Sequence, residues 1–132
     1  MADMRVDVVS AERRLYSGTA TEVYARSLDG EIGLMAGHQP IVLALERAPV
    51  RIKPSDGEAV VVAAHHGFLQ FRDDHLIVLA DIAELVDDID PDRATAARDR
   101  AQQRLSEDSE DAEARASLGR AELRLRVLDE YG

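Results

Sequence analysis

The chain has 132 residues, 45% of them apolar and 32% charged, which is typical of a soluble globular protein and excludes a disordered or fibrous one. With no cysteine, disulfides, thiolate metal sites and cysteine nucleophiles are excluded as well. The 26 acidic and 16 basic residues give a net charge of −10, which repels phosphate backbones, so we expect no nucleic-acid partner.

The hydropathy pattern predicts no transmembrane segment. The longest apolar run covers residues 59–64, far short of the ~20 residues that a membrane-spanning helix requires. The first residues lead directly into an alternating pattern without the long apolar stretch of a secretory signal. We therefore expect a cytoplasmic protein, either free or attached to something larger.

Residues 1–86 are predicted to form short strands joined by tight turns. Residues 4–8 alternate apolar and polar side chains, as a half-buried strand does, and the run Val60-Val61-Val62 indicates a strand buried on both faces. Short strands without intervening helices are typical of an antiparallel β-sandwich or barrel, which we expect for this domain. The predicted strands cover residues 4–8, 20–25, 32–35, 41–45, 50–52, 59–64, 68–71 and 76–80.

Residues 87–132 consist almost entirely of Ala, Leu, Arg, Asp and Glu, and are predicted to form an antiparallel two-helix hairpin. Asp90-Pro91 combines an N-cap acceptor with the residue best tolerated at the first helical position, so the first helix begins there. Ser109 is a candidate cap for the second helix. Apolar residues recur at helical spacing at Ala94, Ala97, Ala101 and Leu105, then at Ala114, Leu118, Ala121, Leu125 and Leu128.

These apolar stripes are rich in alanine, which limits how firmly the hairpin can be held. A buried leucine contributes roughly 1.5–3 kcal/mol and an alanine much less, and any contact must offset the entropy lost on ordering. We therefore expect a stable β domain carrying a detachable helical arm.

Side chains suited to catalysis do not form a recognisable constellation. Adjacent His65 and His66 point to opposite faces of a strand and are poorly placed to share one metal ion. The serines lack a strand-turn-helix elbow, and carboxylate pairs such as Asp73-Asp74 are typical of solvated turns. A Walker-type phosphate loop is also missing from the sequence. These residues predict a protein that is not an enzyme, with no catalytic residue and no metal site.

Arginine supplies fifteen of the sixteen basic residues, eight of them in the helical half. One interpretation is solvated helix faces with ion pairs four residues apart, such as Asp111 with Arg115. The other starts from spacing: Arg93 and Arg100 lie two turns apart on the first helix, and Arg120 and Arg124 one turn apart on the second. In a hairpin, these four guanidinium groups would form a polyphosphate site.

Five segments, in the same order and spacing, resemble the epsilon subunit of bacterial F-type ATP synthases. The first is the loop Asp29-Gly30-Glu31-Ile32-Gly33-Leu34-Met35-Ala36-Gly37-His38-Gln39-Pro40, and it is the five segments in register that make the resemblance specific. The others are Val8-Val9-Ser10 followed by Leu15-Tyr16-Ser17-Gly18, then Gly67-Phe68-Leu69, Ala80-Asp81-Ile82-Ala83-Glu84 and Ile89-Asp90-Pro91-Asp92-Arg93-Ala94.

Two positions depart from the pattern of that family. Ala36 stands where the family usually has proline, and His66 stands where it usually has the first of two glycines. The second change suggests that position 66 does not need a positive φ in this chain.

The resemblance implies a non-catalytic rotor subunit in the central stalk, on the cytoplasmic face of the cell membrane as a peripheral part of the complex. Its partners would be the gamma subunit, the ring of c subunits and, through the extended arm, the alpha/beta catalytic head. The β domain would couple ring rotation to ATP synthesis, and Gly30, Glu31 and His38 would contact the c ring. The alternative for those side chains is a solvated turn with a structural histidine.

For the helical arm, the resemblance implies restraint of ATP hydrolysis and a candidate nucleotide site. No cofactor is required, but ATP would act as a regulatory ligand of the folded arm. The residues that match the family motif or its neighbouring positions are Glu84, Asp90, Arg93, Ala94 and Arg100, and Arg120 and Arg124 would supply the cations of the second helix. We expect Glu84, Asp90 and Ala94 near adenine and the arginines on phosphate.

A competing hypothesis is a free β-sandwich module that binds a small ligand or a metal ion, with the helices as a dimerisation tag. It predicts a self-sufficient apolar pocket or metal uptake at His65 or His66. Co-purification with gamma and the c ring would distinguish the rotor subunit from this module.

Overall fold

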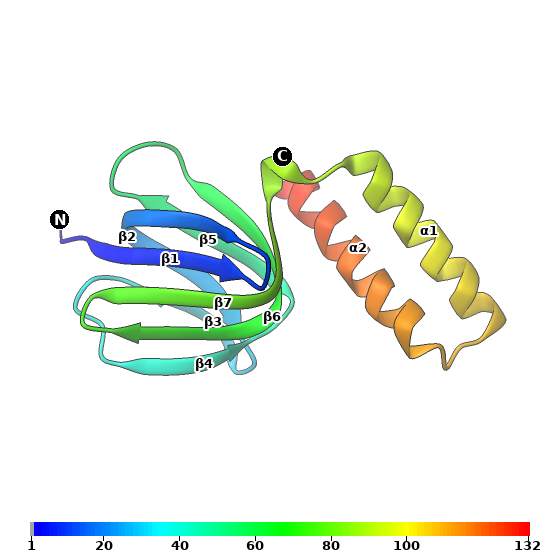
Figure 1. Ribbon diagram of the computed structural model, residues 1–132, viewed down its shortest axis with the longest axis horizontal. Coiled ribbons are helices and arrows are strands. Elements are labelled where there is room, and N and C mark those ends of the chain that lie inside the picture. The colour runs from blue at the N-terminus through cyan, green and yellow to red at the C-terminus, as the bar shows by residue number, and fades with distance from the viewer. Residues whose placement is uncertain (1) are drawn as a thin grey trace. The chain divides into compact units, whose positions relative to one another are not determined.

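In the computed structural model, which describes residues 2–132, the chain divides into a β unit, Met1–Leu85, and a helical unit, Val86–Gly132 (Figure 1). The strands are β1 Met4–Ser10, β2 Arg14–Ser27, β3 Gly30–Leu34, β4 Ile41–Leu45, β5 Ala48–Pro54, β6 Val60–Arg72 and β7 His75–Leu85. The helices are the 3-10 helix η1 Val86–Asp88, followed by α1 Pro91–Glu107 and α2 Ala112–Tyr131.

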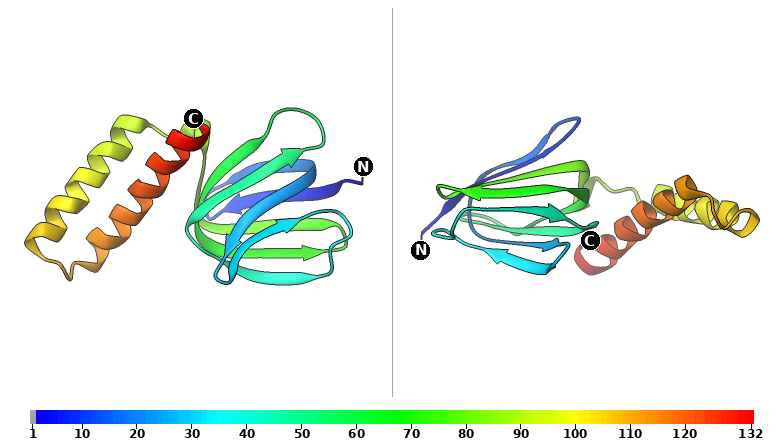
Figure 2. Two further views of the ribbon diagram at one scale, coloured as in Figure 1. Left: turned by 180° about the vertical axis from the view of Figure 1, so that it is seen from behind. Right: turned by 90° about the horizontal axis from the view of Figure 1, so that it is seen from below.

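The seven strands form one hydrogen-bonded sheet that folds over on itself as a sandwich. β1, β7, β6 and β4 run side by side in that order (Figure 1), and β2, β3 and β5 are best seen from behind (Figure 2). The predicted sandwich is confirmed, but β1 and β7 pair in parallel, with Val6 opposite Leu76. A parallel pair is possible here because the two strands come from opposite ends of the unit and need no tight turn between them.

β6 pairs with three other strands, and it joins the two strands predicted at residues 59–64 and 68–71 into one, beginning at Val60. Its first half pairs with β5, its second half with β4, and both halves pair with β7. At the junction, His66 has φ 61°. The expectation that position 66 does not need a positive φ is therefore wrong: this residue adopts a left-handed conformation that is uncommon outside glycine.

The left-handed conformation at His66 changes which side chains of β6 face the core. Val62 and Ala64 face the core before it, and Leu69 and Phe71 after it, so the alternation shifts by one residue. The next residue, Gly67, has φ 131°, and a Cβ at this position would lie 2.0 Å from the carbonyl oxygen of Leu79. β6 and β7 can therefore approach this closely because glycine has no side chain.

The core of the β unit is formed by the inward side chains of both layers, most of them valine, leucine and isoleucine. β2 also runs further than the predicted residues 20–25, because its first half pairs with β1 and its second half with β3 and β5. The largest fully buried side chains are Phe71, Met4, Leu34, Ile52, Leu69, Leu76, Val6, Val8, Val23, Val50, Val62 and Val78.

The helical unit is the predicted antiparallel hairpin. Asp90 caps α1 as expected, accepting hydrogen bonds from the backbone N–H groups of Asp92 and Arg93. The cap of α2 is Asp111, which accepts from the N–H of Ala114, so the prediction of Ser109 is wrong. A carboxylate next to the first helical turn also suits the helix dipole. The buried side chains are small: Ala94 and Ala101 in α1, and Ala114, Ala121, Leu123 and Val127 in α2.

The close approach of Gly67 to the backbone of Leu79 can be tested by substitution. Gly67→Ala is expected to lower the free energy of unfolding by more than about 3 kcal/mol, because backbone clash adds to the strain of its positive φ. Gly57→Ala is the matched control: Gly57 has φ 103° but nothing within 4 Å of an added Cβ, so about 1 kcal/mol is expected. Urea unfolding measures both, and equal losses would contradict the close approach.

Candidate functional site

Strands β4, β6 and β7 present an apolar outer face to solvent. Val42, Phe68 and Leu79 are exposed to 66%, 59% and 51%. Phe68 lies directly opposite Leu79 on β7 and opposite Ala44 on β4, so these side chains form a row across three strands. Contiguous apolar surface of this kind is typical of an interaction site.

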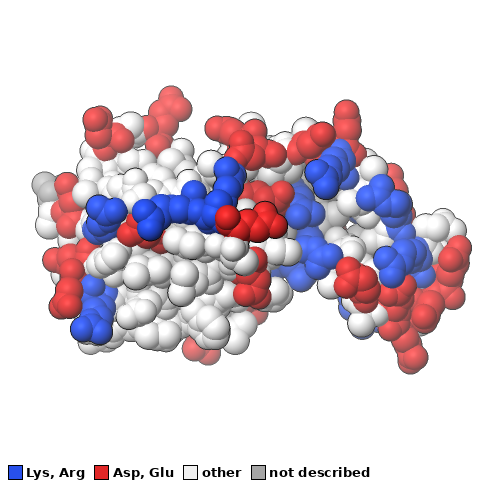
Figure 3. Space-filling view, in the orientation of Figure 1, with Lys and Arg blue, Asp and Glu red and all other residues white. Residues whose placement is uncertain are grey.

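A second row lies beside the first, where Gln70 is opposite Val42 on one side and Ile77 on the other. Figure 3 shows a broad area without charged side chains over this part of the β unit, with acidic and basic residues along its borders. We call the two rows together, namely Val42, Ala44, Phe68, Gln70, Ile77 and Leu79, the apolar face.

A polar cluster borders the apolar face where β1 runs beside β7. Asp7 is buried, with 8% of its surface exposed. Its carboxylate oxygen Oδ2 lies 2.7 Å from Nε2 of His75 and 3.4 Å from Nε of Arg5. Burial alone would raise the pKa of Asp7, but hydrogen bonds with Ser17, His75 and Arg5 and the charge of Arg5 outweigh it and lower the pKa to about 2. Asp7 is therefore ionised at neutral pH, so His75 Nε2 donates the hydrogen bond.

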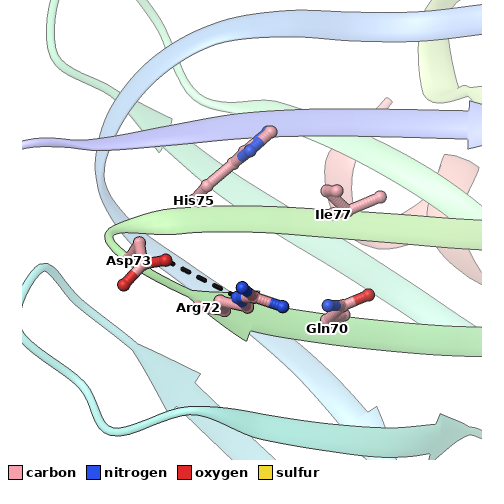
Figure 4. A pocket seen from close by; sticks show the side chains of 5 residues that line it. All are labelled: Gln70, Arg72, Asp73, His75 and Ile77. Carbon is pink, nitrogen blue, oxygen red and sulfur yellow. Dashed lines mark ion pairs between the residues drawn. The ribbon is translucent and has the colours of Figure 1, made fainter.

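Next to His75, the end of the β6–β7 hairpin carries a hollow of about 270 Å³. It is lined by Gln70, Arg72, Asp73, His75 and Ile77, and Figure 4 shows Arg72 and Gln70 on β6 and His75 extending from β7 toward β1. Arg72 Nε lies 3.5 Å from Asp73 Oδ2, and both side chains are largely exposed. The hollow is thus open and polar at the edge of the apolar face.

The loop predicted to contact a ring is partly engaged within the β unit. Glu31 accepts a hydrogen bond from Arg51, whose guanidinium lies 5.1 Å from the ring centre of Tyr24. Gly30 has φ 121° in the turn, and its carbonyl accepts from the hydroxyl of Ser27. Glu31 nevertheless remains about half exposed and faces solvent beside its partner.

His38 has structural contacts in the same unit. Its ring meets Phe71 edge-on at 5.8 Å between ring centres, and Nδ1 donates to the carbonyl of Gln39. The adjacent N–H of Gly37 donates to Asp74 Oδ1 at 2.7 Å. These contacts tie the loop to the β6–β7 turn and favour the structural role for the histidine.

The residues predicted to bind nucleotide occupy both units. Glu84 lies on β7 in the β unit, where its Oε1 is 3.5 Å from Nε2 of the buried His65. In the helical unit, Arg93 and Arg100 are exposed on α1, whereas Ala94 is buried against the hairpin. The carboxylate of Asp90 is already used for capping α1.

On α2, Arg120 donates to Glu113 Oε1 at 3.3 Å and to Ser117 Oγ at 3.0 Å. Arg124 is partly buried one turn further along. The contacts of Arg120 run along its own helix, but its ion pair spans seven residues rather than the expected four. Asp111 pairs with Arg104 at 3.0 Å and the Arg115 side chain donates to the Ser109 carbonyl, in place of the expected Asp111–Arg115 pair. The nucleotide site stays a prediction.

Within residues 2–132, the structure brings no three His, Asp or Glu side chains into a group that could hold a metal ion. Neither α-helix of this described part has the length and apolar character of a membrane span.

Sequence reasoning missed the apolar face and the partners of two charged residues. The available signal was in β4 and β7, where residues 41–45 and 76–80 are apolar at every position. Such a run is compatible with burial on both faces, as it is for Val61 and Val62, yet in β7 Leu79 is exposed. Local pattern could not reveal the Arg51–Glu31 and His75–Asp7 pairs, because their members are far apart in sequence.

Two family models match the chain in succession. The model of the ATP synthase Delta/Epsilon chain beta-sandwich domain matches residues 3–86, and that of the ATP synthase Delta/Epsilon chain long alpha-helix domain matches residues 87–129. Together they cover nearly the whole chain and meet where the strands give way to helices. The chain therefore belongs to the delta/epsilon chain family of ATP synthases.

Relatives within this family include bacterial epsilon chains. The chain is 48% identical to the ATP synthase epsilon chain of Streptomyces avermitilis over 117 residues, which is 89% of this chain and 92% of the relative. It is 50% identical to that of Brevibacillus brevis over 107 residues, 81% of each chain. These relatives confirm the predicted family and the prediction of a non-catalytic subunit, and they do not favour a free ligand-binding module.

The fold also occurs in a solved assembly. A chain in the structure of the Euglena gracilis mitochondrial ATP synthase, OSCP/F1/c-ring, superimposes with a TM-score of 0.80, covering 97% of this chain and 82% of that one. The sequence identity is 19%, so this likeness concerns the fold.

The low pKa of Asp7 predicts that its contacts in the polar cluster stabilise the fold, and this can be tested by substitution. Because the pKa falls from 3.8 in the unfolded chain to about 2 in the folded one, ionised Asp7 stabilises the fold above pH 3.8, and this stabilisation is lost as the pH falls toward 2. Asp7→Asn is expected to lower the free energy of unfolding at pH 7 by about 2 kcal/mol and to make almost no difference at pH 2.

The matched control is Asp3→Asn, which removes one carboxylate from an exposed position outside the cluster. Chemical denaturation of the three proteins at several pH values measures the difference. A deficit in Asp7→Asn that stays constant from pH 7 to pH 2 would show that the carboxylate is not stabilised by these contacts.

Proposed function

We propose that this chain is the non-catalytic central-stalk subunit of a proton-translocating F-type ATP synthase, coupling rotation of the c ring to ATP synthesis and restraining ATP hydrolysis through its helical hairpin. The observation that carries the proposal is the apolar face, presented by a well-packed β unit in a chain whose relatives are epsilon chains. A densely packed sheet transmits strain with little deformation, as a rotor element must.

The gamma subunit is the proposed partner of the apolar face. Full burial of a valine, leucine or phenylalanine side chain contributes roughly 1.5–3 kcal/mol, and Val42, Phe68 and Leu79 each have half or more of their surface to bury. Burial of these three side chains would contribute a few kcal/mol to the free energy of binding, before any polar contact is counted. Such a contribution suits a contact that transmits torque.

The loop from Gly30 to His38 is the proposed contact with the c ring. Glu31 carries the negative charge for basic residues of the ring, and its pairing with Arg51 restricts the carboxylate to one direction. The Glu31 side chain is then already ordered in the free chain, so less conformational entropy is lost on docking. His38 supports the loop from inside through Phe71.

The helical hairpin is the proposed regulatory arm, which extends to the alpha/beta catalytic head in one state and folds down in another. The buried side chains of α1 and α2 are mostly alanine, so the hairpin buries or exposes little apolar area when it moves from one state to the other. Two states separated by a few kcal/mol are readily shifted by a ligand that prefers one of them.

ATP is the proposed ligand of the folded arm. Exposed Arg93 and Arg100 on α1 have guanidinium groups suited to phosphate, with Glu84, Asp90, Ala94, Arg120 and Arg124 as the remaining members of the site. Each tenfold excess of ATP over its dissociation constant adds about 1.4 kcal/mol in favour of the ATP-binding state. As part of the synthase, the chain would be a peripheral protein at the cytoplasmic face of the cell membrane.

The apolar face gives the test of docking. Phe68→Asp is expected to weaken binding of the full chain to its cognate gamma subunit by more than about tenfold, because a charge would be buried in an apolar contact. The control is Ala59→Asp, which places the same charge at an exposed position in the loop before β6. Isothermal titration calorimetry measures both affinities, and equal affinities for the two variants would contradict docking through this face.

A second test concerns nucleotide binding. Titration of the chain with ATP up to millimolar concentration is expected to give saturable NMR shifts of the Arg93 and Arg100 amides, and the double variant Arg93→Ala/Arg100→Ala should lose them because the phosphate contacts are gone. Arg98→Ala is the control, since Arg98 pairs with Asp99 on the same helix. Absent saturation, or equal shifts in the double variant, would remove ATP from the proposal.

A further inference from the structure

The hollow at the end of the β6–β7 hairpin combines groups that bind an anion. Arg72 supplies a guanidinium and Gln70 an amide, His75 and Ile77 form the wall on β7, and the carboxylate of Asp73 lies beside Arg72 (Figure 4). A guanidinium beside a neutral amide donor is an arrangement that recognises carboxylates. The hollow lies entirely within the β unit, and it shares Gln70 and Ile77 with the apolar face, whereas Arg72, Asp73 and His75 have no part in the functions proposed above.

Arg72 is held loosely in the free chain. Its contact is the adjacent Asp73 at 3.5 Å, and the two side chains are 70% and 87% exposed. An ion pair in bulk solvent contributes little, because water screens it and both side chains lose rotamer freedom. A carboxylate arriving within a protein interface would be partly desolvated and would pair more strongly with the same guanidinium.

His75 is held firmly by contrast. Its Nε2 donates to Asp7 Oδ2 at 2.7 Å, and Asp7 is itself fixed by Arg5. In the neutral ring, whose proton is on Nε2, Nδ1 is an acceptor and does not bind a carboxylate, so His75 forms a wall of the hollow that cannot turn away without breaking its contact with Asp7. The hollow therefore has one preorganised wall and one adaptable cation.

The hollow is continuous with the apolar face. Gln70 and Ile77 are opposite each other across β6 and β7, line the hollow, and flank Val42 and Phe68. A segment that covers Phe68 and Leu79 therefore reaches the hollow within about two residues along the strands. Whatever docks on the apolar face must also place some side chain at this position.

We propose that the hollow receives a carboxylate side chain of the protein partner that covers the apolar face, and that Arg72 is its specificity-determining contact. The inference rests on the docking proposed above and names the chemistry at one end of that interface. A carboxylate carries one negative charge and a free phosphate between one and two, so the net charge of −10 and the nearby Asp73 oppose phosphate more strongly.

The test measures the affinity of the full chain for its cognate gamma subunit at low and high salt. Arg72→Gln is expected to weaken binding about tenfold at low salt and to reduce the salt dependence, because one interfacial charge pair is lost. Arg72→Lys should recover part of the affinity but not all, since an ammonium lacks the planar fork. Lys53→Gln, which removes a positive charge from an exposed position on β5, is the control and should bind like the parent chain.

The outcomes separate this inference from the docking on which it rests. If Phe68→Asp weakens binding and Arg72→Gln does not, the carboxylate contact is overturned while docking through the apolar face stands. If neither variant weakens binding, both are overturned. Inorganic phosphate added to the chain alone is expected to leave the Arg72 and His75 NMR signals unchanged, and saturable shifts would identify a free-anion site instead.

Discussion

The close approach of Gly67 to the backbone of Leu79 is the constraint on which the β unit depends. A Cβ at position 67 would lie 2.0 Å from the Leu79 carbonyl oxygen, so the two strands can be this close only because glycine stands there. Together with the left-handed His66, this point bends β6 and shifts its alternation by one residue. The shift turns Leu69 and Phe71 inward and leaves Phe68 outward, so the place of Phe68 on the apolar face is a consequence of this shift.

The two units of the chain differ in what stabilises them, and this difference matches the division of roles proposed for them. The β unit is built around fully buried valine, leucine, isoleucine and phenylalanine, and close packing of that kind makes a stiff body. The hairpin buries mainly alanine, which contributes less per side chain and leaves a smaller barrier to rearrangement. The side chains that each unit buries therefore account for a rigid docking element in one unit and an adjustable arm in the other.

Polar groups at the rim of the β unit are arranged to fix side chains rather than to react. Asp7 orients His75, Arg51 orients Glu31, and Phe71 supports His38. In each case an exposed or half-buried polar residue is anchored by a partner far away in the sequence. Orientation before docking lowers the entropy lost when a partner binds, which is the property expected of a surface that must engage other subunits.

The sequence alone determined the two-part architecture, the capping of α1 by Asp90-Pro91 and the family, because these depend on local periodicity, turn residues and motif order. It did not determine that residues 59–64 and 68–71 form one bent strand, that Asp111 rather than Ser109 caps α2, or that β1 pairs with β7 in parallel. The apolar face and the Asp7–His75 and Glu31–Arg51 pairs were decided only by the tertiary structure. Each of them joins residues from different strands, and no local pattern records which strands will become neighbours or which side of an apolar strand will stay uncovered.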